Sequence, residues 1–294
     1  MSASDMTRRA ALALLAAAGL SRVARAGDPA RVIAAGGSAA EIVFALGAGE
    51  RLIARDTTSS FPPEVLSLPD VGYVRALSPE NLIALSPDLI LAEHDAGPPE
   101  AIEALRRSGT ALVVLPQALD AAGVQAKIEA VAAALDLPEA GAALSVRVAA
   151  RLAEAQAAAQ ALPRVPRVMF ILSMQGGRLL AAGTGTSAEA MIRLAGGANA
   201  VEGVQGYKPL TDEAAIAADP DIILVMDRGG DLAVTLADVQ AHPALRLTQA
   251  GAAGRVIAMD GLYLLGFGPR TGDAALELAL RFGGLLDQAE RGGG

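Results

Sequence analysis

The chain has 294 residues, a formal net charge of −8, two histidines and no cysteine. The lack of cysteine excludes disulfides, thiolate metal sites, a cysteine nucleophile and a lipid-modified cysteine, and two histidines cannot build a multi-histidine zinc or manganese site. The acidic balance argues against nucleic acid as a partner.

The first 26 residues have the layout of a bacterial secretory signal. Arg8 and Arg9 supply a basic start, an apolar run follows over residues 10–20, and residues 24–26 form a small-x-small cleavage site. The run is shorter than the roughly 20 residues that a membrane-spanning helix needs. We therefore expect this segment to be removed on export to the periplasm, and the adjacent arginines point to the twin-arginine route.

The first element expected after the signal is a strand over residues 31–35, which are largely apolar and partly β-branched. Two glycines break this strand. Ser38 and Glu41 then have the spacing of a capping box that opens a helix. The same module returns in the second half, with a strand over 168–172 and a box over 186–189.

A longer segment, residues 77–91, is repeated at residues 210–224. In each copy Ser78 or Thr211 is placed to cap a helix, a proline ends that helix, and an apolar strand follows. Strands that alternate with helices are typical of parallel α/β lobes. The repeat therefore predicts two similar lobes with a cleft between them.

Residues 138–162 are rich in alanine and favour a helix. At 1.5 Å per residue such a helix is ~36 Å long and makes a stiff connector. We expect residues 27–137 to form an N-terminal lobe, 138–163 a linking helix and 164–294 a C-terminal lobe, with little movement between the lobes.

Three short runs carry a resemblance to a known family: VGYVRALS at 71–78, GYKPL at 206–210 and LGFGPR at 265–270. Together with the two lobes, they resemble the substrate-binding proteins of the cobalamin, siderophore and haem importers, and the periplasmic haem-binding proteins in particular. The resemblance implies an α/β fold of two Rossmann-like lobes with parallel sheets, joined by a long α-helix. It implies no enzyme but a monomer that captures haem b, supplied by an outer-membrane haem receptor system, for an inner-membrane ABC permease.

The resemblance assigns Tyr73 as the ligand of the haem iron. A phenolate is a hard anionic donor that suits Fe(III), and tyrosine is a known haem ligand. Since a free phenol keeps its proton at neutral pH, the anion needs the metal charge and a nearby cation. Arg75 lies on the same side of an extended segment, and it is expected to hydrogen-bond the phenolate or to pair with a propionate.

Five further residues are candidates for contact with the haem. Tyr207 is the counterpart of Tyr73 in the repeat and is expected to stack on the porphyrin or to ligate a second haem. Lys208 and Arg270 are expected to meet the propionates, because buried carboxylates need cations or donors. Met174 and His94 each follow a strand, at the edge that lines the cleft in α/β folds. Each of these two is either an opposing axial ligand or a packed rim side chain.

Glu80 and Glu213 occupy equivalent helix starts in the repeat. The resemblance implies that one acidic residue on each lobe docks to arginines of the permease, and these two fit that role. The simpler interpretation is that each carboxylate only interacts favourably with a helix dipole. The two interpretations are compatible.

Two other functions are alternatives to haem binding. The first is the same fold binding a ferric siderophore or a corrinoid, whose pockets are expected to show more arginines and aromatics or a tryptophan, whereas this chain has no tryptophan and 3% aromatics. The second is an exported hydrolase that uses a serine and His94. The chain contains no Gly-x-Ser-x-Gly elbow, which disfavours this second class.

Overall fold

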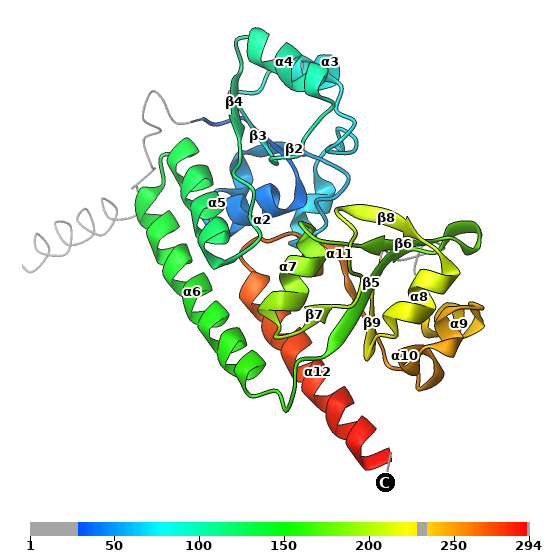
Figure 1. Cartoon of the computed structure of the whole chain (residues 1–294). Helices are drawn as coiled ribbons and strands as arrows, with labels where there is room; N and C mark the ends of the chain where they lie inside the picture. Colours follow the sequence, from blue (N-terminus) through cyan, green and yellow to red (C-terminus); the bar gives the residue numbers. More distant parts are fainter. Residues whose placement is uncertain (1–28, 228–233, 293–294) are drawn as a thin grey trace, which may run out of the picture.

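The computed structural model describes residues 29–227 and 234–292, and the expected export signal lies outside them. Two α/β lobes are joined by a long helix, α6 (Pro138–Gln160), which runs along one side of the molecule (Figure 1). The fold class predicted from the sequence is therefore confirmed, with one correction in the second sheet. Within the described ranges, no helix is both long and apolar enough to cross a membrane.

The N-terminal lobe is built on a four-stranded parallel sheet with the order β2-β1-β3-β4. Strands β1 and β3 are buried at every position, which explains why they are apolar throughout. The strands are β1 (Val32–Ala35), β2 (Leu52–Arg55), β3 (Leu89–Ala92) and β4 (Ala111–Val114), and the α-helices are α2 (Gly37–Ala45), α3 (Pro79–Ala84), α4 (Pro99–Arg107) and α5 (Ala121–Ala134).

The C-terminal lobe is built on a sheet with the order β10-β9-β5-β6-β8, and β7 pairs with β5 beyond this path. Its strands are β5 (Arg167–Ser173), β6 (Leu179–Ala182), β7 (Ala198–Asn199), β8 (Tyr207–Leu210), β9 (Ile222–Asp227) and β10 (Val256–Asp260). Its helices are α7 (Ser187–Leu194), α8 (Asp212–Ala218), α9 (Leu236–Ala241), α10 (Gln249–Ala252), α11 (Gly261–Leu265) and α12 (Thr271–Gly292).

This second sheet is mixed, so the prediction of a parallel sheet is wrong here. Strand β6 runs antiparallel to both β5 and β8. The physical reason is the short connection between β5 and β6, in which Gly176 and Gly177 both take positive φ angles of 60° and 74°. A tight turn can join antiparallel strands, whereas parallel strands need a long crossover.

The predicted caps of the repeated segment are confirmed. The Ser78 hydroxyl accepts the N–H of Asn81 at 3.3 Å at the start of α3, and Thr211 accepts that of Ala214 at 3.2 Å at the start of α8. Thr186 also caps α7 as predicted. The two copies thus begin their helices by the same local chemistry.

In each copy of the repeat, an Asp and an Arg that were not predicted as partners also form matching hydrogen bonds. The Asp88 carboxylate accepts the backbone N–H of Arg31 at 2.9 Å, and Asp221 accepts that of Arg167 at 2.8 Å. Each arginine then donates to a carbonyl at the end of the helix in its own lobe, α3 or α8. These bonds fix the start of β1 and of β5 against the helix that precedes the neighbouring strand.

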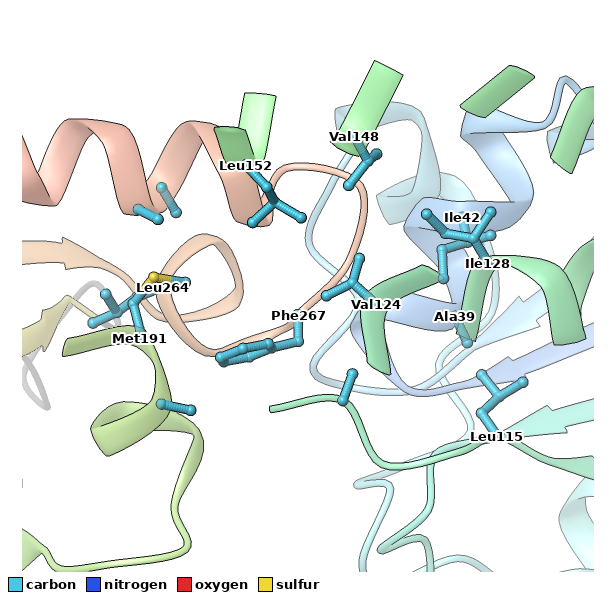
Figure 2. Close-up of a cluster of buried hydrophobic side chains, with 14 of the residues drawn as sticks. Ala39, Ile42, Leu115, Val124, Ile128, Val148, Leu152, Met191, Leu264 and Phe267 are labelled. Carbon is cyan, nitrogen blue, oxygen red and sulfur yellow. The ribbon is translucent and has the colours of Figure 1, made fainter. Parts of the chain in front are cut away.

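One continuous apolar core runs through both lobes and α6. Figure 2 shows Phe267 between Met191 on the side of the C-terminal lobe and Val124 on the side of the N-terminal lobe, with Leu152 of α6 above. Phe267 is almost completely buried and holds a φ of 50°, which is a strained conformation for a side chain of this size. The interior is therefore shared, and the lobes are not two separate packing units.

A buried polar contact accompanies this core. The Arg270 Nε donates to the carboxylate of Glu41, whose side chain is only 5% exposed, and the Arg270 guanidinium lies 3.7 Å from the ring centre of Phe61. We call these three residues the interlobe clamp. The prediction that Glu41 and Ser38 form a capping box is therefore wrong: α2 has Gly36 as its N-cap and makes no side-chain cap bond.

Ser38 instead joins a second buried group beside the clamp. Its hydroxyl donates to Glu93, which also accepts from Lys127 Nζ at 3.0 Å. Lys127 Nζ lies 3.5 Å from the carbonyl oxygen of Gly266, so this group also reaches from one lobe to the other. Substituting Gly268 would disturb both groups, because a Cβ atom there would lie 3.2 Å from Ser38 and from Glu41.

The clamp makes stability depend on pH. Burial raises the pKa of Glu41 above its ordinary 4.5, and the hydrogen bond and charge of Arg270 only partly oppose this effect. The folded protein therefore binds this proton more tightly than the unfolded chain does, so the Glu41 contribution to the free energy of unfolding grows as pH falls through the folded-state pKa.

We expect the free energy of unfolding of the parent protein, minus that of Glu41→Gln, to increase as pH is lowered from 7 towards 4.5. Urea unfolding at a series of pH values measures it. Glu103→Gln, at an exposed carboxylate of α4, is the matched control and should leave the pH profile unchanged. Parallel profiles for the parent protein and Glu41→Gln would contradict the assignment.

Candidate functional site

Tyr73 lies on a loop that runs beside the carboxyl end of β2, and 43% of the side chain is exposed. The loop is held there by backbone bonds: the Val71 N–H donates to Arg55 at 2.9 Å, and the Thr57 N–H donates to Gly72 at 3.0 Å. Gly72 has a φ of 96°, in the region that favours glycine. The loop therefore presents Tyr73 from a defined backbone.

A buried carboxylate supports the loop from below. Asp56 follows β2, is fully buried, and accepts the Ser59 and Thr58 hydroxyls, both at 2.7 Å, and a backbone bond from Val74. Burial raises the pKa of Asp56 above its ordinary value, while these hydrogen bonds oppose the shift. Because Val74 adjoins Tyr73, Asp56 fixes the backbone that carries the tyrosine.

The Tyr73 hydroxyl oxygen accepts a hydrogen bond from Nη1 of Arg75, as one of the two roles expected for Arg75 requires. The guanidinium carbon also lies 5.6 Å from the Tyr73 ring centre. On its other side Arg75 donates from Nε at 2.8 Å and from Nη2 to one oxygen of Asp95. Burial alone would lower the pKa of Arg75, but the Asp95 charge and the Tyr73 bond raise it above its ordinary value.

Tyr207, the counterpart of Tyr73 in the repeat, has different surroundings. Its hydroxyl lies 3.1 Å from that of Ser187, and its ring meets Phe170 edge-on with 6.3 Å between centres. It is partly buried against the shared core. The next residue, Lys208, is exposed on β8. In the part of the chain that the structure describes, the hydrogen bond and the ring contact of Tyr207 are made to Ser187 and Phe170 and not to Tyr73.

The chain has one further tyrosine, Tyr263 on α11. Burial and the nearby carboxylates of Glu277 and Asp273 raise the pKa of Tyr263 to about 12. Its hydroxyl therefore stays protonated at neutral pH. Among the hydrogen bonds of the described residues, Tyr73 is the tyrosine whose oxygen accepts from a guanidinium.

The other predicted site residues fall into different places. His94 lies near the Tyr73–Arg75 pair, because its Nδ1 is 4.0 Å from an oxygen of Asp95, the carboxylate that Arg75 binds. Met174 is partly buried beside the core of the second sheet. Arg270 belongs to the interlobe clamp, and it also lines an open depression of about 450 Å³ that includes Tyr263 but not Tyr73.

Glu80 and Glu213 are both exposed in the first turns of α3 and α8. Glu80 accepts the Ser78 hydroxyl at 3.0 Å, so the residue that caps the helix also orients this carboxylate. Three residues further on, Ile83 and Ile216 are each 39% exposed. Residues three apart share a helix face, so each lobe presents a carboxylate beside an apolar side chain.

The sequence of the chain matches that of a known protein family. The sequence profile of the family described as "Periplasmic binding protein" matches residues 32–262, which is most of the chain. The chain belongs to the periplasmic binding protein family. The matching segment contains both sheets and the Tyr73 loop.

Solved structures agree with this membership. This periplasmic binding protein is similar to the periplasmic heme-binding protein BhuT in complex with two hemes, with 44% identity and a TM-score of 0.83 over 88% of this chain and all of that one. It is also similar to the periplasmic heme-binding protein RhuT from Roseiflexus sp. RS-1 in apo form, with 38% identity and a TM-score of 0.83, covering 87% of this chain and 98% of that chain.

Two further relatives, found by sequence similarity, match this chain over a smaller part of their own length. An uncharacterized ABC transporter substrate-binding lipoprotein, YvrC, from Bacillus subtilis is 25% identical over 68% of this chain and 64% of its own length. A vitamin B12-binding protein from Pectobacterium carotovorum is 38% identical over 30% of this chain and 32% of its own length. The chain thus spans less than two thirds of these two proteins.

Asp95 and Asp56 are the functional candidates in this periplasmic binding protein that sequence reasoning missed. Asp95 follows β3, which was predicted, and Asp56 follows β2, which is a short apolar run in the sequence. Both strands end at the edge of the sheet where binding residues gather in α/β folds. That position is the signal that could have found them. Their partners, Arg75 and Val74, lie on another segment, so the sequence alone did not pair them.

Gly72 offers a test of how the Tyr73 loop is held. A Cβ atom there would meet nothing within 4 Å, so Gly72→Ala adds only backbone strain, which we expect to lower the free energy of unfolding by about 1–2 kcal/mol. Gly284→Ala is the control: this exposed glycine of α12 also has open space, and alanine should stabilise the helix by about 0.5–1 kcal/mol. Urea unfolding measures both, and equal effects would contradict the strain.

Proposed function

We propose that this protein is exported to the periplasm, captures haem between its two lobes and delivers it to an inner-membrane ABC importer. Tyr73 binds the ferric iron through its phenolate oxygen, and Arg75 donates a hydrogen bond to that oxygen. The carried species is haem b, held as cargo and not as a catalytic group. The protein works as a monomer downstream of an outer-membrane haem receptor.

The observation that carries the proposal is the Arg75 donor aimed at the Tyr73 oxygen. A cationic donor favours the anionic form of its acceptor, and a phenolate is a ligand that ferric haem accepts. The similarity to BhuT over nearly the whole chain supports haem as the ligand. The exposed position of Tyr73 supports access for a large planar ligand.

The remaining candidates have supporting roles in this proposal. Tyr207 and Met174 contact the macrocycle from the C-terminal lobe, Lys208 pairs with a propionate, and His94 lines the rim near Asp95. Arg270 meets a propionate only if it leaves Glu41. Apolar wall contact supplies the rest of the binding.

A corrinoid is the second candidate ligand, because vitamin B12-binding proteins match part of the chain. The Tyr73 and Arg75 pair favours haem over this alternative, since ferric haem has open axial positions for a phenolate, whereas the cobalt of vitamin B12 carries an axial base of its own. A hydrolase is disfavoured, because the family and the similar structures are named as binding proteins. Among the described residues, the polar partner of His94 is Asp95, and no hydrogen bond joins His94 to a serine.

Docking to the permease is assigned to Glu80 and Glu213, one on each lobe. Support comes from their equivalent exposed positions on α3 and α8, which lie in different lobes and away from α6 (Figure 1). Ile83 and Ile216 add an apolar contact beside each carboxylate.

The ligand assignment is tested with purified protein lacking the signal. Added hemin should give a high-spin ferric tyrosinate spectrum, and Tyr73→Ala should abolish it and weaken binding about tenfold or more, equivalent to at least about 1.4 kcal/mol. Tyr207→Ala is the matched control and should keep the tyrosinate spectrum. No hemin binding at micromolar concentration, or saturable binding of cobalamin instead, would overturn the assignment.

The docking assignment is tested by charge reversal. Glu80→Lys together with Glu213→Lys should abolish haem uptake by the reconstituted importer, because the helix starts would then repel basic groups, while hemin binding stays intact. Glu103→Lys, an exposed charge reversal on α4, should leave uptake unchanged. Normal uptake by the double variant would show the docking assignment to be wrong.

A further inference from the structure

Asp95 holds the arginine that meets Tyr73. Its Oδ2 accepts from Nε of Arg75 at 2.8 Å and also from Nη2, so two nitrogens of the guanidinium are engaged by one carboxylate oxygen. The remaining terminal nitrogen, Nη1, donates to the Tyr73 hydroxyl. The three side chains thus form a chain of contacts in the order Asp95, Arg75, Tyr73.

We propose that Asp95 is a positioning residue that fixes Arg75 on the Tyr73 oxygen and so sets the strength of the bond from Tyr73 to iron. This inference rests on the proposed function, because it concerns the same tyrosine. It goes further by assigning a role to a residue outside the predicted site and by choosing between the two roles expected for Arg75.

Arg75 needs such a support because its side chain is about half exposed. A free arginine has many rotamers and loses entropy when it is fixed. It would also be drawn to a haem propionate, with which a guanidinium forms a strong paired contact. Binding to Asp95 restricts the rotamers of Arg75 and occupies two of its three nitrogens, so it also competes with a propionate. Because the guanidinium is rigid and planar, the third nitrogen, Nη1, is then directed at Tyr73.

Asp95 is itself held by the backbone of its loop. The loop follows β3, and the Ala96 N–H donates to Glu93 at 2.9 Å. Gly97 then joins the Tyr73 loop twice: its N–H donates to Val74 at 3.0 Å, and its carbonyl accepts from Leu77 at 2.8 Å. The two loops therefore form one unit, and the spacing between Asp95 and Arg75 does not depend on a flexible segment.

The first test uses the ligand-free protein. With tyrosine labelled by ¹³C at the ring carbon that bears the hydroxyl, the chain gives three signals, and Tyr73→Phe identifies that of Tyr73. Asp95→Ala should move the Tyr73 signal in the same direction as Arg75→Ala, and the double variant should move it no further than Arg75→Ala alone. A Tyr73 signal unchanged in Asp95→Ala would overturn the proposal.

The second test uses hemin. As pH is lowered, the proton competes with iron for the phenolate, so the midpoint at which the tyrosinate spectrum is lost should rise by about one pH unit in Asp95→Ala and in Arg75→Ala. The double variant should match Arg75→Ala. A further shift in the double variant would mean that Asp95 acts directly or on folding, and not through Arg75.

Controls separate this inference from the proposed function. Glu103→Ala should leave the Tyr73 signal and the pH midpoint at the values of the parent protein, and thermal unfolding should show that Asp95→Ala is folded. If the parent protein fails to bind hemin, the proposed function is wrong, but the ¹³C experiment still decides whether Asp95 positions Arg75. If hemin binds and Asp95→Ala behaves as the parent protein in both tests, only the inference fails.

Discussion

The structure depends on a core that the two lobes share. Apolar side chains of α2, α5, α6, α7 and α12 form one cluster around the segment that carries Phe267, and the Glu41–Arg270 contact lies beside that segment. Close-packed interiors do not deform continuously, so rotating one lobe against the other would break this packing. The relative position of the Tyr73 loop and the C-terminal lobe is therefore set by the core.

The polar groups at this junction act on specificity more than on stability. Glu93 with Lys127, and Glu41 with Arg270, are largely withdrawn from water. Taking charges out of water costs about as much as the pair regains, whereas leaving one partner alone costs about 3–5 kcal/mol. Alternative placements of the lobes would strand Glu41 and Arg270, which come from different lobes, and would take the Gly266 carbonyl away from Lys127. We interpret the Glu41–Arg270 pair as a contact that, together with the shared apolar core, selects one arrangement of the lobes.

The internal repeat builds a symmetric scaffold around an asymmetric site. Asp88 and Asp221 anchor the first strand of each sheet in the same way, and Ser78 and Thr211 start matching helices. Around the tyrosines the two copies differ: Tyr73 meets a guanidinium, while Tyr207 meets a hydroxyl and an aromatic ring. The two lobes thus share one local scaffold, while among the residues that the structure describes a charged donor stands beside the tyrosine only in the first copy.

The sequence by itself determined the elements whose causes are local. Caps, prolines and buried apolar runs act over a few residues, so the repeated helices and strands, the linking helix and the loop that carries Tyr73 could all be predicted. The sequence also predicted that Arg75 lies beside Tyr73, but for the wrong reason: the segment is not extended, and a turn in which the Ala76 N–H donates to the Tyr73 carbonyl at 2.8 Å brings the two side chains together. Only the tertiary structure decided which groups meet from distant parts of the chain. Ser38 and Glu41 have the spacing of a capping box, yet they bind Glu93 and Arg270, which lie 55 and 229 residues away. Asp95 meets Arg75 because β3 and the Tyr73 loop end at one edge of the sheet, and β6 reverses direction because its connection to β5 is too short for a crossover.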